Sequence, residues 1–183
     1  MTNFLRRLIG GRVSPEQSDG VLAFMAEAWK LQSLQDAEAA RHNDVLTKYG
    51  GPATLDSSAL AEIIPSARRQ SQVYADLRQR HTKLGPVPDE AGAWYFKWES
   101  TYLALEEWAS ATLAWFEGIE AGATPHAGRV EQLHLAEQRA ERDARREEAK
   151  LLKRLGTSAE DVRRLIQEAE AEAASELEEA SDE

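Results

Sequence analysis

The sequence predicts an all-α protein, an up-and-down antiparallel helical bundle from which a charged C-terminal helical arm extends. Helix-capping signals recur along the chain, and apolar residues repeat at helical spacing. No run of alternating β-branched residues is flanked by Asn-Gly or Asp-Gly turns. We expect four regions: a short cationic segment over 1–13, the bundle over 14–122, the arm over 123–156, and an acidic docking helix with a frayed tail over 157–183.

The first helix is predicted from its capping signals. Ser14 suits the N-cap, Pro15 the first helical position, and Gln17 completes a capping box. The helix can run to Tyr49, because the Gly-Gly-Pro sequence at 50–52 supplies a terminating glycine and a proline.

A second helix is predicted over 57–84, where a Gly-Pro sequence ends it. Pro65 removes a backbone donor and clashes with the preceding turn, so we expect a kink or a break near Ile64.

The third helix, over 89–121, is predicted to be the central helix of the bundle. Residues 93–116 contain eight of the thirteen aromatic residues of the chain, and most of them fall within an arc of about 160° on a helical wheel. The alternative is a pocket for an apolar or cationic ligand built from the same rings. Phe96 and Leu103 point to the opposite, polar side, which predicts a second contact surface for an intramolecular element or for a protein partner.

The fourth helix is predicted to begin with Thr124 as N-cap and Pro125 at the first helical position, after Gly122 has ended the third. Its apolar stripe is thin and its middle is almost entirely charged. We interpret it as a solvent-exposed arm stabilised by charge pairs or as one strand of an intermolecular coiled coil. The stripe consists of Val130, Leu133, Ala140, Ala144, Leu151 and Leu155.

The fifth helix is predicted from a capping box formed by Thr157 and Glu160. Val162, Leu165 and Ile166 lie on one side of it, which is typical of a segment that docks onto another helix.

The cationic segment combines apolar and basic residues at helical spacing, with no acidic residue before Glu16. It predicts a short amphipathic helix that docks onto the bundle or onto a partner protein, or that lies on an anionic membrane surface. The residues concerned are Phe4, Leu5, Arg6, Arg7, Leu8 and Ile9, followed by Arg12. A signal peptide is not indicated, because the continuous apolar run is missing.

Composition narrows the classes of function. The net charge is −10, and ten acidic residues against two arginines after 157 place −8 of it in the last region. This balance argues against nucleic-acid binding. A chain without cysteine fits a reducing compartment, and we expect a cytoplasmic location. Sixteen arginines against six lysines, together with thirty alanines, suggest a bacterial or phage origin.

The sequence contains little evidence for a metal site or a catalytic site. Glu131 and His134 form one E-x-x-H pair, whereas a di-iron bundle needs two such pairs with further glutamates. Nucleotide-binding and hydrolase motifs are absent from the sequence. We therefore expect no metal, no cofactor, no small-molecule substrate and no enzymatic activity. The basic cluster around Arg68, Arg69 and Arg80 is interpreted as a solvated helix face or as a surface that meets the acidic tail.

The function expected from the sequence is that of a non-enzymatic helical interaction protein, an assembly, adaptor or structural subunit that acts through helix packing and self-association. The alternative is a peripheral membrane-associated or apolar-ligand-binding bundle, which would use residues 4–9 or the tryptophan core. The residues predicted to bind a protein partner are Phe96, Leu103, Val130, Leu133, Leu151, Leu155, Val162, Leu165 and Ile166.

Overall fold

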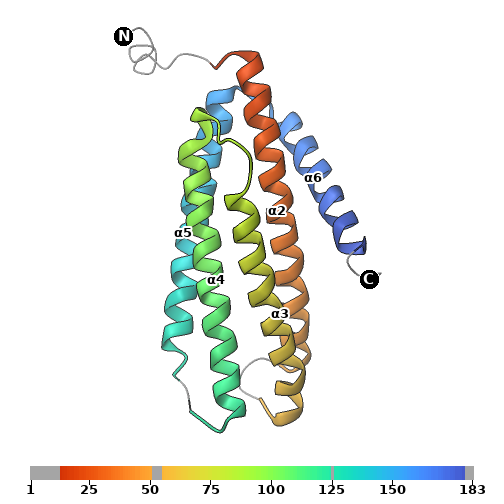
Figure 1. Ribbon diagram of the computed structural model, residues 1–183, viewed down its shortest axis with the longest axis vertical. Coiled ribbons are helices and arrows are strands. Elements are labelled where there is room, and N and C mark those ends of the chain that lie inside the picture. Colours follow the sequence, from red (N-terminus) through yellow and green to blue (C-terminus); the bar gives the residue numbers. More distant parts are fainter. Residues whose placement is uncertain (1–12, 51–54, 125, 180–183) are drawn as a thin grey trace.

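The computed structural model describes residues 13–50, 55–124 and 126–179, and within these ranges the chain is all-helical, without a strand. Figure 1 shows long helices lying side by side. The elements are α2 (Pro15–Lys48), α3 (Ser57–Thr82), the short 3-10 helix η2 (Asp89–Ala91), α4 (Gly92–Glu120), α5 (Gly128–Leu155) and α6 (Ala159–Glu179).

Helices α2, α3, α4 and α5 run in alternating directions, and each packs on the next in chain order (Figure 1). Helix α6 turns back after α5 and packs on α2. Two polar contacts join the end of α5 to the start of α2 and to η2, which precedes α4. Ser18 Oγ donates to the Leu155 carbonyl at 3.4 Å, and Arg154 Nη2 donates to the Glu90 carbonyl at 3.2 Å. The starts of α2 and α4 and the end of α5 therefore share one end of the molecule.

The predicted arm does not extend away from the other helices, because α5 packs along α4. Ala144 and Leu151 are fully buried, and Leu155 is half-buried against the same core. The C-terminal part of the predicted apolar stripe is thus covered within the chain. Charged residues beside the stripe, Glu137 and Glu148 among them, are also buried.

Most helix ends follow the local capping signals. Ser14 and Gln17 form the predicted capping box, and Asp56 accepts hydrogen bonds from the first amides of α3. Gly122 and Gly156 end α4 and α5 with φ of 78° and 71°. These positive values are accessible to glycine without a steric penalty, which explains why the helices stop there.

Two predicted helix starts are wrong. Helix α5 begins at Gly128 without a side-chain cap, so Thr124 does not cap it, and Pro125 lies outside the described residues. Helix α6 is capped one residue later than predicted: the Asp161 amide donates to Ser158 Oγ at 3.1 Å. Serine accepts this bond as readily as threonine, so the sequence alone did not separate the two neighbours.

The break predicted at Pro65 is absent, because α3 continues through it. Pro65 is exposed, and so is Ala61, whose carbonyl loses its usual amide donor. This carbonyl can therefore bond to solvent. Buried residues on both sides of the proline, Ile63 and Ala67, hold the helix in place.

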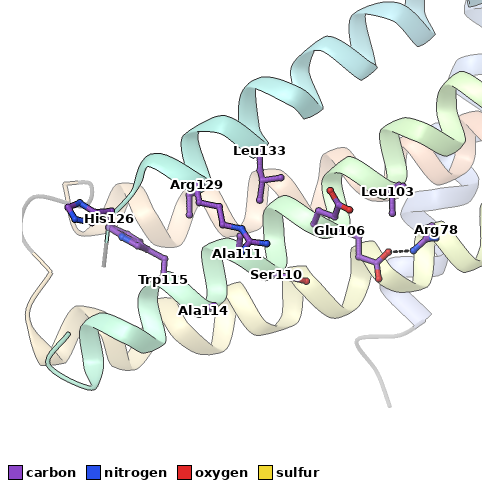
Figure 2. Close-up of a pocket in the computed structure, with 12 residues that line it drawn as sticks. Arg78, Leu103, Glu106, Ser110, Ala111, Ala114, Trp115, His126, Arg129 and Leu133 are labelled. Atoms are coloured by element: carbon purple, nitrogen blue, oxygen red, sulfur yellow. Dashed lines mark hydrogen bonds and ion pairs between the residues drawn. The ribbon is translucent and has the colours of Figure 1, made fainter. Parts of the chain in front are cut away.

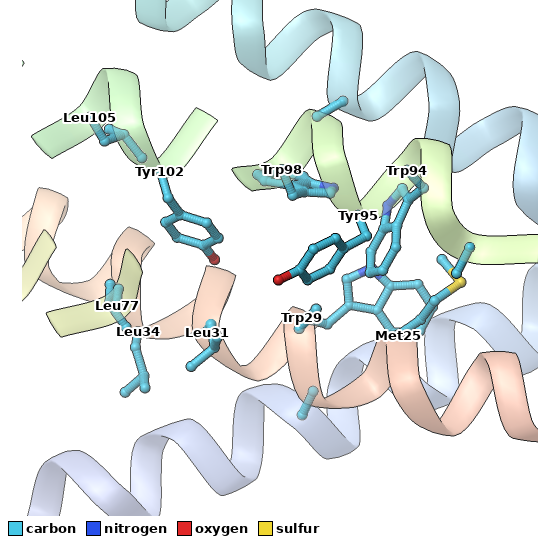
Figure 3. Packing of buried hydrophobic residues seen from close by; sticks show 14 of the residues in the cluster. Met25, Trp29, Leu31, Leu34, Leu77, Trp94, Tyr95, Trp98, Tyr102 and Leu105 are labelled. Carbon is cyan, nitrogen blue, oxygen red and sulfur yellow. The ribbon is translucent and has the colours of Figure 1, made fainter. Parts of the chain in front are cut away.

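The aromatic face of α4 forms the centre of the core, as predicted. Trp94, Trp98 and Tyr102 are each 1% exposed and belong to one apolar cluster with Met25 and Trp29 of α2, and Figure 3 shows Trp94 beside these two residues. Aromatic side chains bury roughly 150 to 250 Å² each, so they contribute a large share of the apolar burial.

The core consists of two apolar clusters separated by buried polar side chains. Along α2 the larger cluster ends at Leu34, and residues packed on the smaller one begin at Val45. On α3 and α4 the gap falls between Ala67 and Val73 and between Ala109 and Leu113. We call the buried polar residues in this gap the polar layer: Gln35, Glu38, His42, Gln70 and Thr112.

Helix α6 is attached by small apolar residues and by ion pairs. Ala169 and Ala173 are buried, 4% and 2% exposed, and alanine allows the close approach of two helices. Glu176 accepts from Arg80 of α3 at 2.6 Å and lies 3.2 Å from Lys30 of α2. Of the basic cluster of α3, Arg80 thus meets the acidic region within one chain, whereas Arg68 and Arg69 pair with Glu117 of α4 and Glu38 of α2.

Candidate functional site

An open surface groove of about 730 Å³ lies along α4 and the start of α5. Figure 2 shows Arg129 and Leu133 of α5 on one side and Leu103, Glu106 and Ala111 of α4 on the other. The groove is mixed in character. It is lined by Arg78, Leu103, Glu106, Glu107, Ser110, Ala111, Ala114, Trp115, His126, Arg129, Val130 and Leu133.

Helix α4 presents two large apolar side chains to solvent beside this groove. Phe96 is 63% exposed and Leu103 is 40% exposed. Seven residues separate them, which places both on the same face of the helix, about 10 Å apart along its axis. No described residue covers them, so the intramolecular partner considered for these positions is not part of the described structure.

The charges on this face are mainly negative. Helix α4 contains five glutamates and one lysine, a net charge of −4. Glu106 pairs with Arg78 of α3 at 2.6 Å, shown as the dashed line in Figure 2. Glu99 and Glu107 lie within about 60° of Phe96 on the helical wheel, whereas Lys97 is about 100° away. The two exposed apolar residues are therefore set among carboxylates.

The structure brings four of the nine predicted partner-binding residues to this region. Leu103, Val130 and Leu133 line the groove, and Phe96 lies two turns before Leu103 on the same face of α4, outside the groove lining. The other five pack within the chain instead. They are Leu151, Leu155, Val162, Leu165 and Ile166, all of which belong to or pack against the larger apolar cluster.

Residues 1–12 lie outside the described residues, so the predicted segment with Phe4, Leu5, Arg6, Arg7, Leu8 and Ile9 has no structural description. Among the residues that are described, no helix is both long enough and apolar enough to cross a membrane.

A second polar arrangement lies inside the bundle, around Glu148 of α5. Its Oε2 accepts a hydrogen bond from Trp94 Nε1 at 3.0 Å and from Trp29 Nε1 at 3.3 Å. Arg145 lies 3.8 Å from the other oxygen and 4.8 Å from the Trp98 ring centroid. Arg145 also donates to the Gln32 side chain at 3.0 Å. This network joins α2, α4 and α5, and it has a structural character because the Glu148 carboxylate pairs with the indole N–H groups of Trp29 and Trp94.

Glu137, one turn from His134 on α5, is 6% exposed. Burial raises its pKa to about 7, with the nearby Glu141 carboxylate adding to the effect. Burial raises the pKa of the Tyr74 hydroxyl above its usual value, and the charges of Glu38 and Glu137 add to this effect. Tyr74 therefore lies near both carboxylates. Glu38 lies in the polar layer and pairs with Arg69 and Arg41 at 3.2 and 2.9 Å.

The E-x-x-H pair does not form in space. His134 lies 3.5 Å from Glu137 and 2.8 Å from the Gln138 side chain, not against Glu131. Across the described ranges, no three His, Cys, Asp or Glu side chains converge as metal ligands would.

Sequence reasoning missed the buried charges of α5. One signal could have found them: Glu137, Ala144, Glu148 and Leu151 are spaced at 7, 4 and 3 residues, so both glutamates share the face of the apolar stripe. A charged residue on an apolar face is a candidate for a buried, paired group.

The fold and the groove define the class of this chain as an all-helical protein with an open surface groove lined by apolar residues and by charged residues of both signs. Beyond this class the comparisons add nothing: no family model matches the chain, and no curated protein or solved structure matches it either.

Proposed function

We propose that this protein is a non-enzymatic interaction protein, an assembly or adaptor subunit built as an up-and-down antiparallel bundle, which self-associates through the outer face of α4 and the adjoining groove. One observation carries the proposal: Phe96 and Leu103 are 63% and 40% exposed on the same helix face, next to a groove of about 730 Å³. Exposed apolar residues that adjoin a groove mark interaction surfaces.

Burial of these side chains would contribute to the driving force for an interface. Complete burial of a fully exposed Phe or Leu side chain contributes roughly 1.5 to 3 kcal/mol, and Phe96 and Leu103, which are 63% and 40% exposed, would each contribute part of that amount. Val130, Leu133 and the alanines of the groove would add to this total. The carboxylates at the edge favour a partner with basic residues and disfavour an acidic one.

The C-terminal part of the α5 stripe, from Ala144 to Leu155, and the apolar side of α6 are not part of this proposal. Ala144 and Leu151 of α5 and Ala169 of α6 pack within the chain, so a coiled coil with a second molecule would have to displace these contacts. The surface on α4 requires no such displacement.

Light scattering coupled to size exclusion tests the proposal on the full chain. We expect a dimer whose dissociation constant rises at least tenfold in Leu103→Asp. The matched control is Leu135→Asp, because Leu135 is also an exposed leucine, 50% exposed, but does not line the groove. A chain that stays monomeric up to the highest measurable concentration, or a dimer equally sensitive to both variants, would contradict self-association through this surface.

A further inference from the structure

We infer that the outer face of α4 in one chain binds residues 4–12 of a second copy, an inference that rests on the self-association proposed above and names the segment responsible for it. The occupant is thus a short cationic amphipathic segment of the same sequence. Three features of the chain support this assignment: charge, apolar spacing and reach.

The charges of the two surfaces are complementary. Residues 1–13 contain Arg6, Arg7 and Arg12 and no acidic residue. On α4 the exposed Glu107 has no basic residue paired with it among the described residues, and Glu99 likewise has none. The arginine side chains of the segment can therefore pair with these two carboxylates.

The apolar spacing of the segment also matches the face. Phe4, Leu5, Leu8 and Ile9 recur at positions i, i+1, i+4 and i+5, a spacing that would place them on one side of a two-turn helix. Phe96 and Leu103 are about 10 Å apart along α4, close to the length of two helical turns. One side of the segment can thus cover both exposed residues.

Reach favours a second copy over the same chain. Phe96 points away from the core side of α4, whereas α2 meets α4 on its core side, where the Phe24 ring lies 6.2 and 6.0 Å from the Trp94 and Tyr95 rings. Phe24 is nine residues, about 13 Å, along α2 from Pro15, and a path from the start of α2 to Phe96 must also pass around α4, about one helix diameter or roughly 10 Å. If residues 4–9 are helical, residues 10–13 span at most about 14 Å. A segment that comes from a neighbouring molecule is not limited by the distance between the start of α2 and Phe96 in one chain.

Chemical cross-linking can identify the contact directly, because the chain contains no cysteine. Gly10→Cys and Ser100→Cys chains are mixed and treated with a short bis-maleimide. Ser100 is an exposed small residue of α4 between Phe96 and Leu103. We expect a cross-linked species of about twice the 20.4 kDa chain mass. The matched control replaces Ser100→Cys with Ala174→Cys, since Ala174 is a small exposed residue on α6.

Equal cross-linking to positions 100 and 174 would overturn the inference. So would a Gly10→Cys/Ser100→Cys double variant that cross-links only within a single chain, because this result would mean that the segment binds its own molecule.

A charge exchange provides a second, independent test. Arg6→Glu/Arg7→Glu should weaken the dimer roughly tenfold by placing like charges together. Adding Glu99→Arg and Glu107→Arg to the same chain should restore the dimer. If Leu103→Asp disrupts the dimer but the arginine variant does not, the inference fails while the proposed function stands. If neither variant affects the oligomeric state, both fail.

Discussion

Trp94 on α4 donates a hydrogen bond to the carboxylate of Glu148 on α5 across 3.0 Å, and Trp29 of α2 donates to the same oxygen. A single acidic side chain thus satisfies two buried indole donors from two different helices. The arrangement explains how α5, whose sequence is mostly charged, can be an integral part of the core.

Glu148→Ala should therefore destabilise the protein strongly. It leaves two buried N–H groups without an acceptor, and each such group costs about 1 to 3 kcal/mol. We expect the free energy of unfolding, measured by urea denaturation, to fall by about 3 kcal/mol. Glu148→Gln keeps one oxygen acceptor and should cost less. Glu147→Ala is the control, because that glutamate makes only a local pair with Lys150 and should change stability by less than about 1 kcal/mol.

The raised pKa of Glu137 predicts a specific pH dependence. Its value in the folded state is about 7, against 4.5 for an unperturbed glutamate, so folding favours the protonated carboxyl. The stabilising contribution is complete below pH 4.5 and is lost as pH rises through 7. Glu137→Gln should be more stable than the natural chain by about 1 to 2 kcal/mol at pH 8, with the difference vanishing near pH 5. A difference that is constant from pH 5 to pH 8 would contradict this prediction.

His81 should respond to pH in the opposite direction. The ring is fully buried and stacks on Tyr95 at 4.6 Å, and burial lowers its pKa to about 4. Folding therefore favours the neutral ring, and stability is lost as pH falls from about 6.5 toward 4. Neither ring nitrogen has a hydrogen-bond partner within the described chain. His81→Phe keeps the stacking and should raise the melting temperature, with a larger gain at pH 5 than at pH 8.

The attachment of α6 can be tested with two adjacent alanines. Ala173 is 2% exposed whereas Ala174 is exposed. Ala173→Leu inserts a larger side chain where the two helices are closest, at a cost of about 1 to 3 kcal/mol. We expect faster tryptic cleavage after Arg163 and Arg164, because α6 separates more often from α2. Ala174→Leu should leave the cleavage rate unchanged, and equal cleavage in both variants would show that the buried alanine does not control attachment.

Much of the helical framework could be predicted from the sequence, because capping is a local property. Ser14 with Gln17 and the glycines at 122 and 156 define helix ends through their own bonds and φ values. The start of α5 was harder, since Gly128 begins the helix without a side-chain cap. Local sequence signals do not predict the end of a helix where packing determines it.

The candidate surface was partly predictable and the polar interior was not. Phe96 and Leu103 stood out because a helical wheel separates them from the other aromatic residues. Glu148 did not, since its burial depends on indoles 54 and 119 residues away in the sequence. A charge pattern alone cannot show which glutamate faces solvent and which faces a tryptophan.

The polar layer has a consequence for how the helices align. Arg69 Nε donates to Glu38 at 3.2 Å, and His42 Nδ1 lies 2.8 Å from Ser66 Oγ, so two polar contacts fix α2 against α3. Sliding α2 by one turn, about 5.4 Å, would break both contacts and carry the Glu38 carboxylate toward the isoleucines of the smaller cluster. Apolar surfaces alone would tolerate such a shift far better, so these few polar groups select a single register for the whole bundle.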